Sequence, residues 1–117
     1  MFRRKELVDV PVDLVQRPVP GMTVHTAESM VVLTVPLSSA PVLIDVASSR
    51  RPTSLSDGGL VVNLIPVRDG RLVPAFDPKR GWIIPLTEAV AADLATQVAG
   101  AVGAYEIAGL NLGIVVE

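Results

Sequence analysis

His25 is the only histidine in the chain and the first residue to test for catalysis. A nucleophilic serine with a histidine base commonly sits in a Gly-x-Ser-x-Gly turn between a strand and a helix. The nearest segment, Ser-Leu-Ser-Asp-Gly at 54–58, lacks the first glycine. We therefore predict no catalytic residue and expect His25 on the surface of a strand. A pocket that joined Asp45 or His25 to Arg50 would instead indicate a small enzyme.

The residues that bind metals and cofactors do not occur in a recognisable pattern. The chain has no cysteine and one histidine, whereas transition-metal sites usually take several such ligands. The aspartates are scattered, which argues against a Ca²⁺ loop. Glycines gather at 100, 103, 109 and 113, but their spacing matches neither the dinucleotide fingerprint nor the Walker loop. The sequence thus predicts no metal ion and no cofactor.

Two adjacent arginines, Arg50 and Arg51, are the first candidates for contact with a partner. They lie in 47–59, a segment rich in Ser, Gly, Pro and Arg that predicts a mobile surface loop. Paired guanidinium groups can dock on carboxylates or phosphates. The alternative is an ordinary solvated loop.

The charge balance argues against nucleic acid as that partner. The net charge is −2, the pI is near 5.3 and aromatic residues make up only 3% of the chain. A nucleic-acid surface would combine a basic patch with aromatic side chains for stacking. We expect protein partners instead, and no small-molecule substrate is indicated.

A second candidate surface lies on the one helix that the sequence predicts, over 86–103. Thr87 is placed to cap its first turn, and an apolar stripe recurs every four residues. Small residues form a parallel row: Ala91, Ala95, Ala99 and Gly103. Such a row lets a helix or sheet approach closely, within the chain or from another subunit. The alternative is that alanine simply favours helix.

The third candidate is the apolar strand at 114–116, formed by Ile114, Val115 and Val116. A strand of this kind can pair with the sheet edge of a neighbouring subunit. It can equally close the sheet of its own domain, and the sequence leaves both alternatives open.

These candidates must be positioned by a strand-rich fold. Apolar patterns predict strands at 7–15, 22–35, 42–46, 60–67, 72–76, 82–84 and 107–117. Asp69-Gly70 predicts a hairpin turn. Within 30–35, Val31 and Leu33 share one face and Val32 lies on the other, which is typical of a central strand or an interface. No internal repeat is visible. The prediction is one mainly β (α+β) domain over 1–117, an antiparallel β-sandwich or partly open barrel with one C-terminal helix.

The composition indicates that much apolar surface needs covering. Half of the residues are hydrophobic and the mean hydropathy is +0.50, yet no uncharged apolar run approaches the roughly 18 residues of a spanning helix. Basic residues at 3–5 are followed by acidic ones, so we also expect no signal peptide. Burial against other subunits would cover the excess. The alternative is a compact monomer.

The size, composition and strand-plus-helix layout resemble small structural proteins of tailed bacteriophages that infect GC-rich hosts. The bias toward arginine over lysine, with abundant valine and alanine, suits such a genome. The resemblance implies a non-enzymatic minor tail, head–tail connector or capsid-decoration subunit. Such a protein would contact copies of itself and other structural proteins in a virion; outside a virion we expect it in the cytoplasm. Two alternatives stay open, a ligand-binding or regulatory module and a small enzyme subunit.

Overall fold

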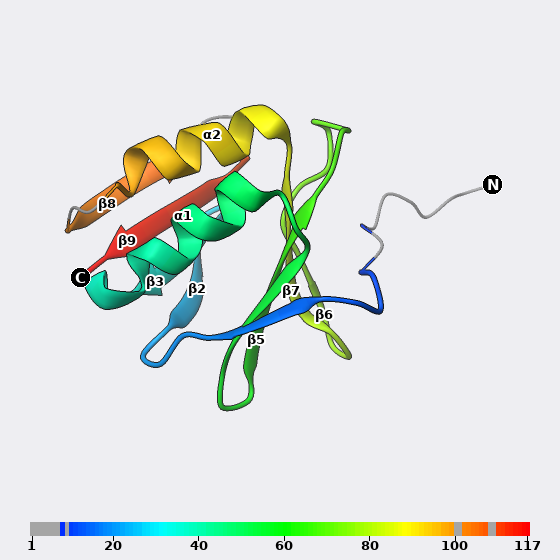
Figure 1. Cartoon of the computed structure of the whole chain (residues 1–117), viewed down its shortest axis with the longest axis horizontal. Coiled ribbons are helices and arrows are strands. Elements are labelled where there is room, and N and C mark those ends of the chain that lie inside the picture. The colour runs from blue at the N-terminus through cyan, green and yellow to red at the C-terminus, as the bar shows by residue number, and fades with distance from the viewer. Residues whose placement is uncertain (1–7, 9, 100–101, 108–109) are drawn as a thin grey trace.

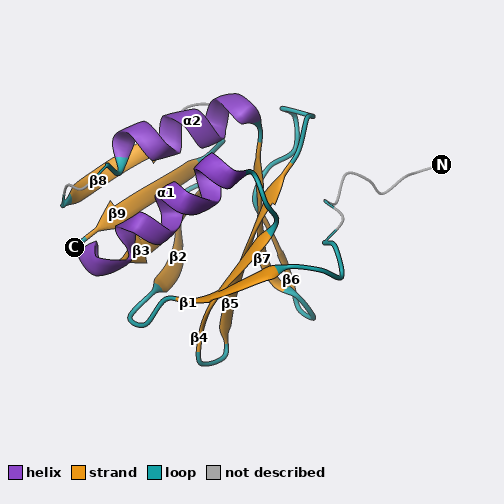
Figure 2. Cartoon of the chain, in the orientation of Figure 1, coloured by secondary structure: helices purple, strands orange, loops and turns teal. Residues whose placement is uncertain are grey.

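The computed structural model describes residues 8, 10–99, 102–107 and 110–117. They form two β-sheets and two α-helices, labelled in Figure 1 and coloured by type in Figure 2. The strands are β1 (Val15–Pro18), β2 (Thr23–Ala27), β3 (Met30–Val35), β4 (Thr53–Asp57), β5 (Leu60–Pro66), β6 (Ala75–Asp77), β7 (Gly81–Leu86), β8 (Gly103–Ile107) and β9 (Leu112–Val116). The helices are α1 (Ala40–Ser49), after a short 3-10 turn at Leu37–Ser39, and α2 (Glu88–Gln97). The fold is mainly β and sandwich-like, as predicted, although three of the seven strand pairs are parallel and not antiparallel.

One structural unit, ββαββ, occurs twice along the chain. The first unit is β2-β3-α1-β4-β5 and the second is β6-β7-α2-β8-β9. Each unit gives one antiparallel hairpin to each sheet, so the sheet orders are β2-β3-β9-β8 and β1-β4-β5-β7-β6. The hairpins meet in parallel pairs, β3 with β9 and β5 with β7, and β1 adds in parallel to β4. The repeat is thus one of topology, which explains why the sequence does not reveal it.

A single core lies between the helices and the two sheets. In Figure 1 the helices lie side by side over one face of the four-stranded sheet, with the five-stranded sheet next to them. Fully buried side chains come from each part: Leu43 from α1, Leu94 from α2, Leu64 from the five-stranded sheet and Leu33 from the four-stranded sheet. Strand alternation turns Val32 to the opposite face from Leu33. Each sheet therefore has one face on the core and one outer face.

The strand predicted at 42–46 is wrong, because this segment lies inside α1. Its β-branched residues favour a strand, which hid a second pattern. The buried positions recur at helical spacing: Ala40, Leu43, Val46 and Ala47. Pro41 is at the start of the helix, where its missing N–H costs no hydrogen bond. The described residues therefore contain two α-helices where the sequence predicts one.

The loop predicted at 47–59 is also wrong. Its first residues finish α1, and β4 follows, paired on one side with β1 and on the other with β5. Thr53 and Ser54 are buried, and the Thr53 hydroxyl donates a hydrogen bond to the carbonyl of Arg51 at 2.9 Å. A strand of serine and threonine has little hydrophobic signal, so only its neighbours in the sheet identify it.

The strand predicted at 7–15 begins only at its last residue. β1 starts at Val15, and Val12 is 102% exposed. Val10 instead accepts a hydrogen bond through its carbonyl from Nη1 of Arg80 at 3.1 Å. Residues 7 and 9 lie outside the described part. Alternation alone does not make a strand at residues 10–14, where Pro11 removes a donor and the structure pairs no strand with these described residues.

The predicted helix at 86–103 is confirmed at its start and is shorter at its end. The Thr87 hydroxyl accepts a hydrogen bond from the N–H of Val90 at 3.2 Å, the predicted N-cap. The Glu88 carboxylate lies in the first turn, where the helix dipole favours negative charge. α2 ends at Gln97, and Gly103, predicted to end the helix, begins β8 instead. Residues 98–99 form a turn and a bend, and residues 100–101 lie outside the described part of the chain.

Asp69-Gly70 does not form the predicted hairpin, because β5 and β6 are separated by β7 in the sheet. The loop is instead closed by Asp69, whose carboxylate accepts hydrogen bonds from the backbone N–H of Arg71 at 2.9 Å and from its guanidinium at 3.0 Å. The side-chain hydrogen bonds from Arg71 hold the pKa of the Asp69 carboxyl below its usual range. Among the described residues, turns that join paired strands lie at 28–29, 58–59 and 78–80.

Candidate interaction surface

The outer face of the four-stranded sheet is not covered by either helix, since α1 and α2 lie on its inner side (Figure 1). The pairing register aligns its outward side chains in rows across β2, β3, β9 and β8. The middle row is His25, Val32, Gly113 and Glu106, and the next row is Thr23, Thr34, Val115 and Ala104. Ala27 and Met30 belong to a third row. These ten residues are called the open face below.

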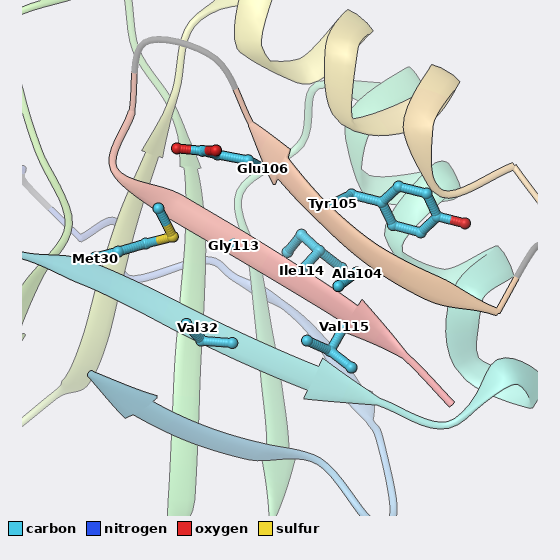
Figure 3. A pocket seen from close by; sticks show the side chains of 8 residues that line it. All are labelled: Met30, Val32, Ala104, Tyr105, Glu106, Gly113, Ile114 and Val115. Carbon is cyan, nitrogen blue, oxygen red and sulfur yellow. The ribbon is translucent and has the colours of Figure 1, made fainter. Parts of the chain in front are cut away.

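Met30, Val32 and Val115 form the apolar centre of the open face. All three are partly exposed although β3 and β9 are the central strands of their sheet. Together with Gly113 they line a hollow of about 310 Å³, which Figure 3 shows with its lining residues. A Cβ atom at Gly113 would lie 3.1 Å from Sδ of Met30. The methionine side chain therefore lies over the glycine.

The edges of the open face carry its ionisable side chains. His25 on β2 and Glu106 on β8 are both exposed and occupy opposite ends of the middle row. Thr23 adds a hydroxyl at one end of the next row, and the remaining edge positions are Ala27 and Ala104. The open face therefore has an apolar centre between two edge strands that carry both polar residues and alanine.

The outer face of the five-stranded sheet differs from the open face, because it is buried at its centre. Asn63, Ile65 and Ile83 point away from the core and are 2%, 4% and 3% exposed. Nδ2 of Asn63 donates hydrogen bonds to the carbonyls of Arg80 and Trp82 at 2.9 and 3.0 Å. The open face is the equivalent surface of the four-stranded sheet, and among the described residues it stays more exposed, although Thr34 on it is only 9% exposed.

The structure gives Arg50 and Arg51 different positions. Arg50 ends α1 in the left-handed conformation, with φ at 56°. Its Nη1 donates hydrogen bonds to the carbonyls of Leu86 and Thr87 at 2.8 and 3.2 Å. Arg50 therefore joins the end of α1 to the start of α2, and its guanidinium faces carbonyls of its own chain. Arg51 remains exposed.

Arg50→Ala is expected to lower the free energy of unfolding by about 2 kcal/mol, since hydrogen bonds from a charged donor to two carbonyls are lost. Arg51→Ala is the matched control and should change it by less than about 0.5 kcal/mol, as is usual for exposed residues. Urea denaturation of both variants measures the difference. Equal losses would contradict the role given to Arg50.

Within the described part of the chain, Arg50 lines one hollow and Asp45 lines another. Asp45 lines a hollow of about 200 Å³ together with Arg51 and Arg17, and its Oδ2 is 3.5 Å from Nη1 of Arg17. His25 lies on the open face. The arrangement that would have indicated a small enzyme is therefore not formed by these three residues.

The row of small residues does not form one continuous surface. Ala91 is 2% exposed and Ala95 packs against the core. Ala99 lies beyond the end of α2 and is exposed, whereas Gly103 lies in β8. Because α1 packs against α2, close approach at Ala91 and Ala95 serves packing within the chain.

The strand at 114–116 closes its own sheet. β9 is paired on one side with β3 and on the other with β8, so it has no free edge to offer another subunit. Ile114 and Val116 point into the core and are 1% exposed. Val115 points outward, and it is the one sequence-predicted candidate on the open face.

Most of the open face is not recognisable in the sequence. Met30 and Val32 have a signal, because their strand is apolar on both faces. Nothing in the sequence pairs β3 with β9 or β9 with β8, so Gly113 and Glu106 could not be added to them. His25 was correctly expected on a strand surface, without its neighbours.

No three or more His, Asp or Glu side chains in the described residues are grouped to hold a metal ion. Neither helix in that part of the chain has the length and apolarity to cross a membrane. The sequence matches no protein-family model and no curated protein.

Proposed function

We propose that this protein is a non-enzymatic subunit that binds other protein chains, copies of itself included, in a larger symmetric assembly. The open face carries the proposal. Its centre of Met30, Val32 and Val115 is apolar and partly exposed, and its edge strands carry the polar residues Thr23, His25 and Glu106. Stable interfaces combine an apolar centre with a polar rim in the same way.

The composition supports an assembly role. Half of the residues are hydrophobic, and the open face shows where part of that apolar material is left at the surface. The net charge of −2 is small, so electrostatic repulsion between copies would be weak. Both features favour association with other chains.

The assembly we propose is the virion of a tailed bacteriophage, in which the protein would be a minor tail, connector or capsid-decoration subunit. Size, composition and the strand-rich layout support this form of the proposal. A ring or lattice joins many copies, so contacts that are weak one by one add up through multivalency. The virion would then be where the protein is found; an assembly in the cytoplasm is the alternative.

The proposal is tested by measuring the mass of the protein in solution by light scattering over a concentration series. We expect the wild-type chain to form a discrete oligomer or to associate as concentration rises. Val32→Lys should abolish this, because it buries an unpaired charge at the centre of the contact. Val12→Lys is the matched control, since Val12 is 102% exposed, and should associate like the wild type. Association that Val32→Lys leaves unchanged would contradict the role of the open face.

A ligand-binding or regulatory module is the second candidate, and the hollow at Gly113 favours it. Its volume of about 310 Å³ lies at the lower end of the range for small-molecule pockets, roughly 300–1,000 Å³. A bound small molecule in native mass spectra of a monomeric protein would support this function in place of assembly.

A further inference from the structure

The open face is complementary to itself. Its middle row has His25 on one edge strand and Glu106 on the other, with Val32 and Gly113 between them. If two such faces stack about a two-fold axis parallel to the strands, the strand order is reversed in the second copy. His25 of each copy then lies opposite Glu106 of the other, and Val32 lies opposite Gly113.

One of these pairs matches in chemistry and the other is apolar. The imidazole N–H of His25 can donate to the carboxylate of Glu106, and both side chains are exposed at the edges. The Val32 methyl groups of one copy meet the Gly113 position of the other, where Sδ of Met30 lies close to the glycine. Met30, which lies over that glycine, is flexible enough to adapt its packing. The stack is an aligned sheet pair, with strand directions within about 30° and sheets about 10 Å apart.

We infer that the open face binds the open face of a second copy, in a two-fold stack of the two four-stranded sheets. This dimer rests on the proposed function, and it makes a second copy of the chain the first partner. No other arrangement of two stacked faces with aligned strands pairs both His25 residues with Glu106: an axis perpendicular to the strands places His25 opposite His25.

The size of the face predicts a weak dimer. Four strands about 4.8 Å apart, with five residues of about 3.3 Å each, give roughly 300 Å² of planar area per copy. A standard interface buries about 800 Å² per partner. The dimer is therefore expected to be reversible and to form as concentration rises.

Cross-linking between two single-cysteine variants tests the arrangement, because the natural chain has no cysteine. His25→Cys and Glu106→Cys are made separately and treated with a short bismaleimide, alone and as an equal mixture. In the stack His25 is about 10 Å from Glu106 of the other copy. The two His25 residues are about 14 Å apart across the strands alone, and farther in space. We expect a covalent dimer in the mixture and little covalent dimer in either variant alone. The covalent dimer should be lost from the mixture when both variants also carry Val32→Lys.

Exchanging the charges gives a second measurement. His25→Glu places two carboxylates opposite each other at both ends of the stack. The dissociation constant of the dimer, measured by sedimentation, should rise roughly ten-fold. Adding Glu106→Lys to it should restore association. Dimers that cross-link equally well in the unmixed variants, or that ignore the charge exchange, would overturn the two-fold stack and leave the proposed function standing. A chain that stays monomeric and never cross-links would overturn the inference together with self-assembly.

Discussion

Gly81→Ala is expected to lower the free energy of unfolding by about 3 kcal/mol or more, from backbone strain and steric overlap together. Gly81 begins β7 with φ at 91°, which L side chains rarely adopt. A Cβ atom there would lie 2.6 Å from the carbonyl oxygen of Val61 and 2.9 Å from its Cβ. Val61 belongs to β5, so relief of the overlap requires the parallel β5–β7 pair to move apart. Urea denaturation followed by circular dichroism measures the loss.

Gly58→Ala separates strain from overlap. Gly58 also has a positive φ, 60°, but nothing lies within 4 Å of a Cβ atom placed there. It should cost only about 1 kcal/mol, the ordinary penalty for a side chain in the left-handed region. If the two variants lose the same stability, close approach of β5 and β7 at Gly81 is not what requires the glycine.

Leu33→Ala is expected to cost about 3 kcal/mol of unfolding free energy, because it leaves a cavity in the core. Leu33 is 0% exposed and lies in β3, between Val24 of β2 and Ile114 of β9. Both neighbours point to the same face, so rearrangement around the cavity would disturb two strand pairs. The variant should keep the wild-type dependence of the free energy on urea, with a lower midpoint.

Val32→Ala is the control, one residue along the same strand. Val32 is partly exposed on the open face, so the loss should stay below about 1 kcal/mol in dilute protein. A loss as large as that of Leu33→Ala would mean that the outer face of this sheet is buried in the monomer. That result would remove the observation on which the proposed function rests.

Local patterns were sufficient where residues close to each other in the sequence decide the structure. Thr87 followed by an apolar stripe predicts the start of α2, and the structure places its hydroxyl on the N–H of Val90. The alternation in 30–35 correctly predicts that Leu33 and Val32 face opposite ways. The strand-rich composition predicts the fold class.

Patterns failed where a distant strand or helix determines the outcome. The β-branched residues of 42–46 favour a strand, yet burial against both sheets and α2 holds them in a helix. The serine-rich segment 53–57 has no strand signal, yet lies between β1 and β5. Asp69-Gly70 suits a hairpin, yet β7 lies between the strands that it would connect. In each case tertiary contacts outweigh a local preference of about 1 kcal/mol or less.

The amino-acid sequence alone is enough to establish a cysteine-free, weakly charged, mainly β chain that is rich in aliphatic residues. It also separates Val32 from Val31 and Leu33, because side chains alternate along any strand. The folded structure was needed to show which of these faces enters the core and that β3 pairs with β9, a pairing that brings Val32, Gly113 and Glu106 into one row. The two strands lie far apart in the chain, and their pairing depends on the packing of both helices and both sheets at once. No local pattern contains that information, so the open face became visible only in the folded molecule.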